Sequence, residues 1–255
     1  MNEPVIERRQ LRKPQEAAMK VCLPKLSLII VAVVTFSVAP SFDRVLCVAH
    51  AQTHDESSHH RRPADIHQYL EHLDGSQRDT DQQPERVIEA LGLQPGLSVA
   101  DIGAGSGYFT RRFVQAVTQK GKVYAVDVEP DMLQYAQASI ARMPIPSTVE
   151  FILAQPDNPQ LPLQSGDLVF LCNVYHHLND RSVYFSKVRP ALKPGGRIAI
   201  IDFYHDARSG DVGFPRKHLV PRDTVVEEMA KAGFQLTREH TFLARQYFLE
   251  FSPTP

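Results

Sequence analysis

The sequence predicts an α/β fold: a doubly wound, mostly parallel seven-stranded sheet with a C-terminal antiparallel hairpin and helices on both faces. Short apolar segments alternate along the chain with amphipathic segments of helical period, which is typical of parallel strands covered on both faces. The last two apolar segments are separated by only four residues, 242–245, too few for a parallel crossover. The 255 residues are 43% hydrophobic and 22% charged, an ordinary globular composition.

The expected strands are short apolar runs bounded by residues that favour turns. In chain order they are residues 98–102, 123–126, 149–154, 168–172, 198–201, 235–241 and 246–251. The first five are expected to be parallel, because a helix or long connection separates each from the next. The last two are expected to form the hairpin.

The expected helices lie before and between these strands, at residues 64–73, 84–91, 108–118, 131–141, 181–192 and 224–232. Pro84 suits the first turn of a helix, and Gly92 and Gly233 suit helix ends. The connection 204–221 contains no expected element. Long connections often carry function, so this one is a candidate lid over a bound substrate.

Residues 1–51 are expected to be a signal peptide or, if uncleaved, a membrane anchor. Residues 26–39 form an uncharged apolar run of 14 residues, shorter than the about 20 that span a bilayer and typical of a secretory signal. Ala49-His50-Ala51 predicts cleavage before Gln52. The domain is then expected to be exported or periplasmic, or held at the membrane by residues 21–40.

Residues 52–63 are expected to be a polar, histidine-rich linker, and residues 64–255 to be the folded domain. The linker histidines have no regular ligand spacing, so no metal site is predicted. A formal net charge of -1 gives no electrostatic argument for a nucleic-acid partner. The sequence leaves the oligomeric state open.

A glycine-rich turn follows the first expected strand. Gly103, Gly105 and Gly107 alternate there, which permits a tight turn and a close approach of backbone to a ligand. In doubly wound sheets, ligands bind at the carboxyl ends of the strands. The spacing is not the G-x-G-x-x-G of dinucleotide-binding proteins, and the lysine of a nucleotide phosphate loop is absent from the turn.

An acidic residue, Asp127, follows the second expected strand, 24 residues beyond Gly103. A carboxylate at this place can accept hydrogen bonds from ribose hydroxyls. The alternative is a carboxylate that starts the next helix, but Asp131 already fills that position. We therefore predict that Asp127 binds ribose.

Three segments, in order, resemble motifs of class I S-adenosylmethionine-dependent methyltransferases: VADIGAGSGYFT, KVYAVDVEPDML and ALKPGGRIAIIDF. The resemblance extends from Pro84 to Phe251. Within the family, the sequence resembles the small-molecule methyltransferases, including ubiquinone/menaquinone C-methyltransferase-like proteins. The resemblance implies S-adenosylmethionine as cofactor and a small-molecule or lipid-like methyl acceptor.

The resemblance also implies roles for individual residues. Asp101 is expected to orient the glycine turn and to help hold the methionine amino group of the cofactor. The expected cofactor-binding residues are Asp101, Gly103, Gly105, Gly107, Asp127, Met132 and Asn173. Met132 would lie beside the adenine, with ordinary helix packing as the alternative.

The third family motif departs from its usual Gly-Asp-Ala form, because residues 154–159 are AQPDNP. Counting from the third strand places Gln155 at the adenine amino group. Counting back from Leu161-Pro162 places Asp157 there. We slightly favour Asp157.

Methyl transfer from a sulfonium is an in-line displacement, in which the protein aligns the reactants and sometimes supplies a base. The candidate catalytic residues are Tyr175, His176 and His177, which follow the fourth strand; a histidine titrates near neutral pH. The alternative is that the His-His pair only packs and forms hydrogen bonds.

Two other functions fit the same motifs. The chain would be a non-catalytic S-adenosylmethionine sensor if it binds the cofactor without using it. It would be a protein methyltransferase if its acceptor is a polypeptide, but no added recognition domain is evident in the sequence.

Overall fold

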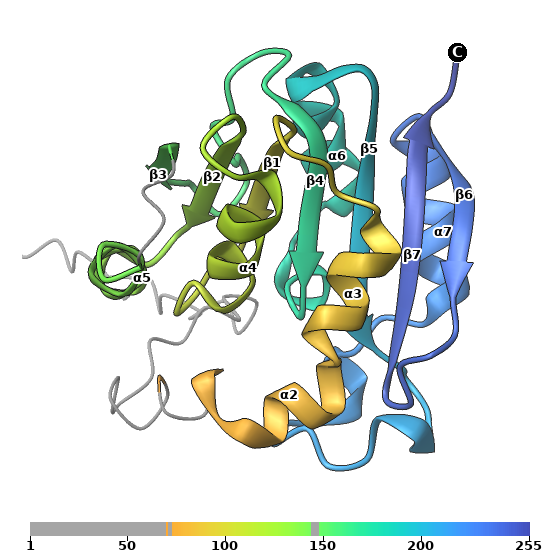
Figure 1. The fold of residues 1–255 in the computed structure, drawn as a ribbon. Coiled ribbons are helices and arrows are strands. Elements are labelled where there is room, and N and C mark those ends of the chain that lie inside the picture. Colours follow the sequence, from red (N-terminus) through yellow and green to blue (C-terminus); the bar gives the residue numbers. More distant parts are fainter. Residues whose placement is uncertain (1–69, 71–72, 144–147) are drawn as a thin grey trace, which may run out of the picture. The chain divides into compact units, whose positions relative to one another are not determined.

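The computed structural model describes Leu70 and residues 73–143 and 148–255, which form a seven-stranded sheet in the order β3-β2-β1-β4-β5-β7-β6 (Figure 1). The strands are β1 (Ser98–Ile102), β2 (Lys122–Asp127), β3 (Thr148–Leu153), β4 (Gly166–Cys172), β5 (Leu192–Phe203), β6 (Phe234–His240) and β7 (Gln246–Pro253). The first five strands pair in parallel, and β7 is antiparallel to both β5 and β6. The predicted fold class is confirmed.

Helices cover both faces of the sheet. They are α2 (Ser76–Gln82), α3 (Pro84–Leu91), α4 (Tyr108–Val117), α5 (Pro130–Ile140), α6 (Arg181–Val188) and α7 (Arg222–Lys231). Helices α3 and α4 lie on one face, and α6 and α7 lie on the other (Figure 1). Fully burying one large apolar side chain stabilises the fold by about 1.5–3 kcal/mol, so the two apolar layers hold these helices in place.

Alternation along the strands determines which side chains meet which helices. In β1, Val99 joins the layer under α3 and α4, whereas Ala100 and Ile102 join the layer under α6 and α7. Asp101 therefore faces α4, where it meets Thr110. Because the central strands are parallel, the loops after β1, β2, β4 and β5 all leave the same edge of the sheet, here called the carboxyl edge.

The structure corrects the region around residues 181–203. The helix expected over 181–192 ends at Val188 and is followed by a 3-10 turn, Arg189–Ala191. Strand β5 then begins at Leu192, six residues before the expected strand 198–201, and continues through Lys193-Pro194-Gly195-Gly196. The pairing with β4 jumps from Leu192 to Arg197, so these residues bulge out of the ladder instead of ending the strand.

The structure also adds an unexpected helix, α2, whose sequence SQRDTDQ has no apolar residue. The lead-in helix expected at 64–73 falls almost entirely outside the described residues, as do the signal segment 1–51 and the linker 52–63. None of the helices that the structure describes has the length and apolar composition of a membrane span.

Candidate active site

The glycine turn lies at the carboxyl edge between β1 and α4. Gly103, Gly105 and Gly107 all have positive φ, at 70°, 54° and 79°, which glycine adopts at little cost. The backbone N–H of Gly103 donates to the carbonyl of Val126 at 2.8 Å. A Cβ on Gly103 would lie 2.2 Å from a methyl carbon of Val174, so the turn is packed directly against the segment that follows β4.

The Asp127 carboxylate closes the turn from β2. One oxygen accepts a hydrogen bond from the N–H of Gly105 at 2.8 Å, and the other accepts from the N–H of Glu129 at 3.0 Å. These two bonds hold the Asp127 carboxylate at the carboxyl edge, beside the glycine turn. Glu129 is the residue that precedes the first turn of α5, so Asp127 contacts both the glycine turn and the start of that helix.

Asp101 is a buried carboxyl directly before the turn. It accepts a hydrogen bond from the Thr110 hydroxyl at 2.6 Å. Burial raises the pKa of Asp101 to about 7, against the opposing effects of Thr110 and of the positive charge on Arg78. The fold therefore favours the protonated form of Asp101. The stability that this protonated carboxyl contributes is fully present below the ordinary carboxyl pKa and is lost as the pH rises through about 7.

Arg78, on α2, is a positively charged residue close enough to Asp101 to lower the pKa of that carboxyl. Its guanidinium lies 4.0 Å from the centroid of the Tyr108 ring and donates to the carbonyl of Leu73 at 2.7 Å. The opposite charges of Arg78 and Asp101 match the ammonium and carboxylate of an α-amino acid. These residues therefore fit the methionine part of S-adenosylmethionine, although Arg78 was not predicted from the sequence.

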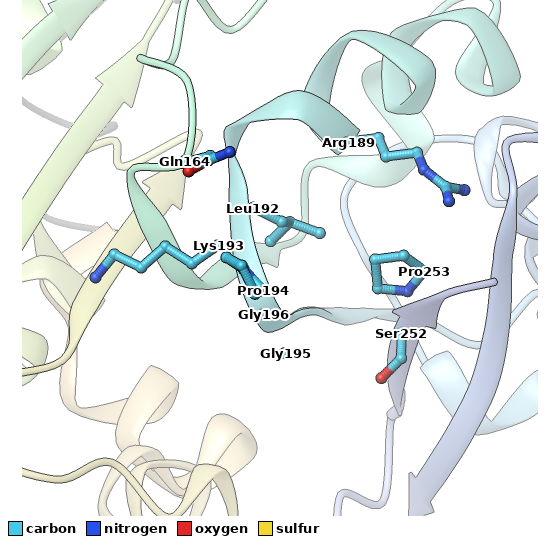
Figure 2. Close-up of a pocket in the computed structure, with 9 residues that line it drawn as sticks. All are labelled: Gln164, Arg189, Leu192, Lys193, Pro194, Gly195, Gly196, Ser252 and Pro253. Atoms are coloured by element: carbon cyan, nitrogen blue, oxygen red, sulfur yellow. The ribbon is translucent and has the colours of Figure 1, made fainter. Parts of the chain in front are cut away.

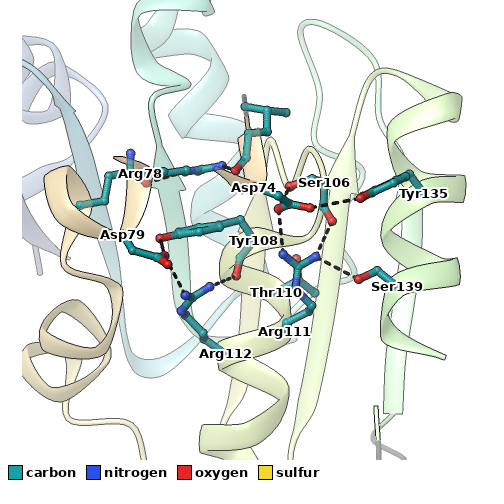
Figure 3. A network of polar contacts seen from close by, with 12 residues as sticks. Asp74, Arg78, Asp79, Ser106, Tyr108, Thr110, Arg111, Arg112, Tyr135 and Ser139 are labelled. Atoms are coloured by element: carbon teal, nitrogen blue, oxygen red, sulfur yellow. Dashed lines mark hydrogen bonds and ion pairs between the residues drawn. The ribbon is translucent and has the colours of Figure 1, made fainter. Parts of the chain in front are cut away.

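A polar network joins the segment before α2 to the glycine turn (Figure 3). Asp74 accepts hydrogen bonds from the Ser106 hydroxyl at 2.7 Å, from Arg111 at 2.8 Å and from the Tyr135 hydroxyl at 3.3 Å. Arg111 also donates to the carbonyl of Ser106 at 2.9 Å. Leu73 would lie 3.4 Å from a Cβ on Gly105. This segment therefore covers the turn.

His176, in the 3-10 turn after β4, pairs with Asp202 at the end of β5. Its Nδ1 lies 2.8 and 3.0 Å from the two oxygens of Asp202, and its backbone N–H donates to the same carboxylate at 3.0 Å. The side chains are 3% and 1% exposed. The ring lies against His177, with centroids 4.1 Å apart, and stacks on Phe214, with centroids 5.2 Å apart.

Tyr175, the third predicted catalytic residue, is directed elsewhere. Its ring is fully buried, and its hydroxyl donates to Glu228 of α7 at 2.7 Å. Arg181 donates to the same Glu228 oxygen at 2.7 Å. Burial, and next the hydrogen bond to Glu228, raise the pKa of Tyr175 well above its usual value. This arrangement suits a structural contact between α6 and α7 and argues against a base.

The residues expected near the adenine are placed as follows. Met132 is buried in the first turn of α5. Gln155 is exposed and follows Ala154, whose N–H donates to the carbonyl of Asp127 at 2.8 Å. Asp157 is exposed and pairs with Lys187 at 2.7 Å, which lowers the pKa of the Asp157 carboxyl.

Asn173 has a φ of 59°, in the left-handed region. Its side-chain oxygen accepts a hydrogen bond from the Gln246 amide at 2.6 Å. Gln246 is the first residue of β7 and is fully buried. The antiparallel final strand thus brings a residue from far along the chain to the carboxyl edge, a contribution that the sequence did not predict.

A cavity of about 410 Å³ lies away from all these residues (Figure 2). Its lining includes Lys193, Pro194 and Gly195 near the start of β5 and Pro253 at the end of β7. These positions are at the edge opposite to the glycine turn, where doubly wound sheets do not bind their ligands. Within the described residues, no cluster of three or more histidine, cysteine or acidic side chains is arranged to hold a metal.

Comparisons with known proteins agree with this geometry. A family model described as a methyltransferase domain matches residues 99–196. A ubiquinone/menaquinone biosynthesis C-methyltransferase from Shewanella oneidensis is 27% identical over 117 residues, which are 46% of this chain and 47% of that protein. The chain therefore spans about half the length of the curated relatives it matches.

Solved structures are similar over more of the chain. A SAM-dependent methyltransferase from Aquifex aeolicus is 26% identical with a TM-score of 0.67, over 73% of this chain and 97% of that one. A TehB-like SAM-dependent methyltransferase from Corynebacterium glutamicum shares the fold. It is 15% identical with a TM-score of 0.57, over 76% of this chain and 100% of that one. Residues 99–196 thus match the methyltransferase domain model, and S-adenosylmethionine is the cofactor that this match and the similar S-adenosylmethionine-dependent structures imply.

Proposed function

We propose that this protein transfers a methyl group from S-adenosylmethionine to a small-molecule or lipid-like acceptor. The observation that carries the proposal is the closure of the glycine turn by Asp127, which binds the N–H of Gly105 at the carboxyl edge. The turn has the glycine spacing of methyltransferases and not that of dinucleotide-binding proteins. When bound, the cofactor supplies an electrophilic methyl group on a sulfonium.

The residues of this chain bind and orient the reactants. Asp127 accepts hydrogen bonds from the ribose hydroxyls, and Asp101 accepts from the methionine ammonium. Gly103, Gly105 and Gly107 let the backbone approach the cofactor closely. Holding the methyl group in line with the acceptor lowers the barrier to such a displacement.

The adenine end of the site is assigned from the sequence resemblance. Met132 packs beside the ring, and Asn173 contacts the cofactor from the end of β4. Gln155 and Asp157 both stay candidates for the adenine amino group, since both are exposed and the Asp157 carboxylate has acceptor positions beyond the one paired with Lys187.

The acceptor class is proposed by analogy with the relatives. The ubiquinone/menaquinone biosynthesis enzyme among them suggests an aromatic or lipid-like compound. A non-catalytic sensor and a protein methyltransferase are the two alternatives, and both would bind the same cofactor.

We further propose that the domain acts outside the cytoplasm, or at the membrane if residues 21–40 remain attached. The support is the apolar run with its A-x-A pattern, Ala49-His50-Ala51. S-adenosylmethionine is made in the cytoplasm, so an exported enzyme would need a supply. A reporter fused after residue 255 should be found in the exported or membrane fraction, and a cytoplasmic reporter would contradict the location without affecting the activity proposal.

The proposed activity is tested by binding and by transfer. S-adenosylmethionine should raise the melting temperature and NAD should not, because a ligand stabilises only the protein that binds it. Stabilisation by NAD alone would overturn the proposal. Label from methyl-tritiated S-adenosylmethionine should then appear in organic-extractable acceptors. Binding without transfer to any small molecule or protein would favour the sensor.

A further inference from the structure

The side chain of His176 has one ring nitrogen that the fold leaves unsatisfied. Because Nδ1 faces the two oxygens of Asp202 at 2.8 and 3.0 Å, Nδ1 carries the proton and Nε2 presents a lone pair. Nε2 is buried and has no hydrogen-bond partner among the described residues. A buried nitrogen without a hydrogen-bond partner is unfavourable unless a ligand or water satisfies it.

A second unsatisfied atom lies at the same edge of the sheet. The side-chain oxygen of Gln246 is buried without a partner in the described part of the chain, while its amide donates to Asn173. Asn173 and His176 belong to the segment that follows β4, and Gln246 begins β7. Two unpaired polar atoms at the carboxyl edge indicate a site for a polar ligand.

This segment also adjoins the cofactor turn. Val174, two residues before His176, is the side chain that a Cβ on Gly103 would meet at 2.2 Å. Strand β4 lies between β1, which carries the glycine turn, and β5, which carries Asp202. The His176–Asp202 pair is therefore on the side of the cofactor turn away from Asp127.

We propose that His176 is the general base of the methyl transfer, positioned by Asp202, and that the acceptor is a phenol-type compound whose hydroxyl gives its proton to Nε2. This proposal rests on the proposed function and names the acceptor class for the same site. The acceptor oxygen loses its proton to Nε2 as its oxygen–carbon bond to the methyl group forms. The sulfur–carbon bond breaks and its electron pair stays on sulfur, so the positive charge moves from the sulfonium to the imidazolium.

A general base such as His176 favours a phenol hydroxyl over an amine or a thiol as the methyl acceptor. A phenol is a weak nucleophile until it loses its proton, and an adjacent base activates it. A neutral amine already has a free electron pair, and an acidic thiol ionises without help. The buried Asp202 carboxylate stabilises the imidazolium that forms.

The surroundings select a planar acceptor. Phe214 stacks on the His176 ring with an interplanar angle of 24°, and the His177 ring lies beside it. Phe214 also stacks on His218, with ring centroids 6.4 Å apart, so an aromatic acceptor would pack edge-on against this cluster. Phe214 belongs to the connection 204–221, so the candidate lid of the sequence is also the wall of this site.

The competing explanation is structural, because the His176 backbone also ties the turn after β4 to β5. The His176→Asn variant separates the two roles, since its amide can replace Nδ1–H as a donor to Asp202 but offers nothing in place of Nε2. His240→Gln is the matched control. His240 lies on the edge strand β6, and its Nε2 also pairs with a carboxylate oxygen, that of Glu250 at 2.7 Å.

The experiment compares phenol, aniline and thiophenol, which have the same shape, as acceptors of label from methyl-tritiated S-adenosylmethionine in the full chain. The wild type and His240→Gln should methylate phenol, and His176→Asn should do so about 100-fold or more slowly, the usual contribution of a general base. Thiophenol, which ionises unaided, should be methylated by all three proteins. Nitrogen-15 NMR of the histidine rings should place the His176 proton on Nδ1.

Several outcomes would overturn the inference. These are equal phenol rates in the wild type and His176→Asn, loss of thiophenol transfer together with phenol transfer in His176→Asn, or a proton on Nε2. A wild type that binds the cofactor but methylates only aniline, or none of the three probes, would refute the phenol-type acceptor class. The proposed function would remain intact in that case. Absence of cofactor binding would instead remove the proposed function itself.

Discussion

Replacing Gly103 with alanine tests the close packing of the cofactor turn. The φ of Gly103 is 70°, and an L-residue in this region costs about 1–2 kcal/mol. The new Cβ would also lie 2.2 Å from a Val174 methyl carbon, and displacing a packed side chain costs about 1–3 kcal/mol more. We expect Gly103→Ala to lower the free energy of unfolding by about 2–5 kcal/mol.

Gly195→Ala is the matched control. Gly195 has a similar φ of 78°, but a Cβ there would meet nothing within 4 Å. It should therefore show only the backbone cost of about 1–2 kcal/mol. Urea unfolding of the wild type and both variants measures the difference, provided that the m-values agree.

A double variant identifies the source of the difference. Val174→Ala removes the methyl groups that the new Cβ would contact, so Gly103→Ala should cost about 1–3 kcal/mol less in that background. Gly103→Ala should also weaken the melting-temperature increase that S-adenosylmethionine produces. Equal costs for Gly103→Ala and Gly195→Ala, or full additivity with Val174→Ala, would refute the argument.

Three further predictions follow from the charged groups. The pKa of Asp101 is raised to about 7, and only its ionised form offers a negative charge to the cofactor ammonium. Cofactor affinity should therefore fall about tenfold from about pH 8 to about pH 6, and calorimetry should show that Asp101→Asn loses this dependence. Asp127→Ala leaves the N–H of Gly105 without its acceptor and removes the proposed ribose acceptor. The dissociation constant of S-adenosylmethionine should therefore rise about 10–100-fold, and an unchanged constant would exclude the ribose role. Glu228→Gln leaves Arg181 without its partner charge and should lower the free energy of unfolding by about 1–3 kcal/mol in urea, whereas unchanged stability would mean that the ion pair contributes nothing.

The strands were predictable because burial on both faces demands continuous apolar residues, as in β4. The glycine turn and Asp127 were predictable because their backbone and hydrogen-bonding requirements restrict residue type at fixed spacing. Helix α2 was not, since its sequence has no apolar stripe. Its long-range contacts are polar, such as the one between Asp81 and Arg245, 164 residues apart in sequence.

Within the predicted catalytic segment, the structure separates neighbours that the sequence grouped. Tyr175 and His176 lie in a 3-10 turn, where successive side chains point about 120° apart. Tyr175 therefore reaches Glu228 on α7, and His176 reaches Asp202 on β5. An acid that ends the apolar run Ile198–Ile201 was the available sign of Asp202, but its partner depended on the strand order.

The antiparallel course of β7 has a practical consequence for handling the protein. The strand starts at Gln246 beside the candidate site and ends at Pro253, and Figure 1 shows the C-terminus at the far edge of the sheet. An affinity tag or surface tether attached after Pro255 would therefore leave the cofactor turn facing solution. Immobilisation through that end is accordingly the orientation of choice for measuring ligand binding on a sensor chip.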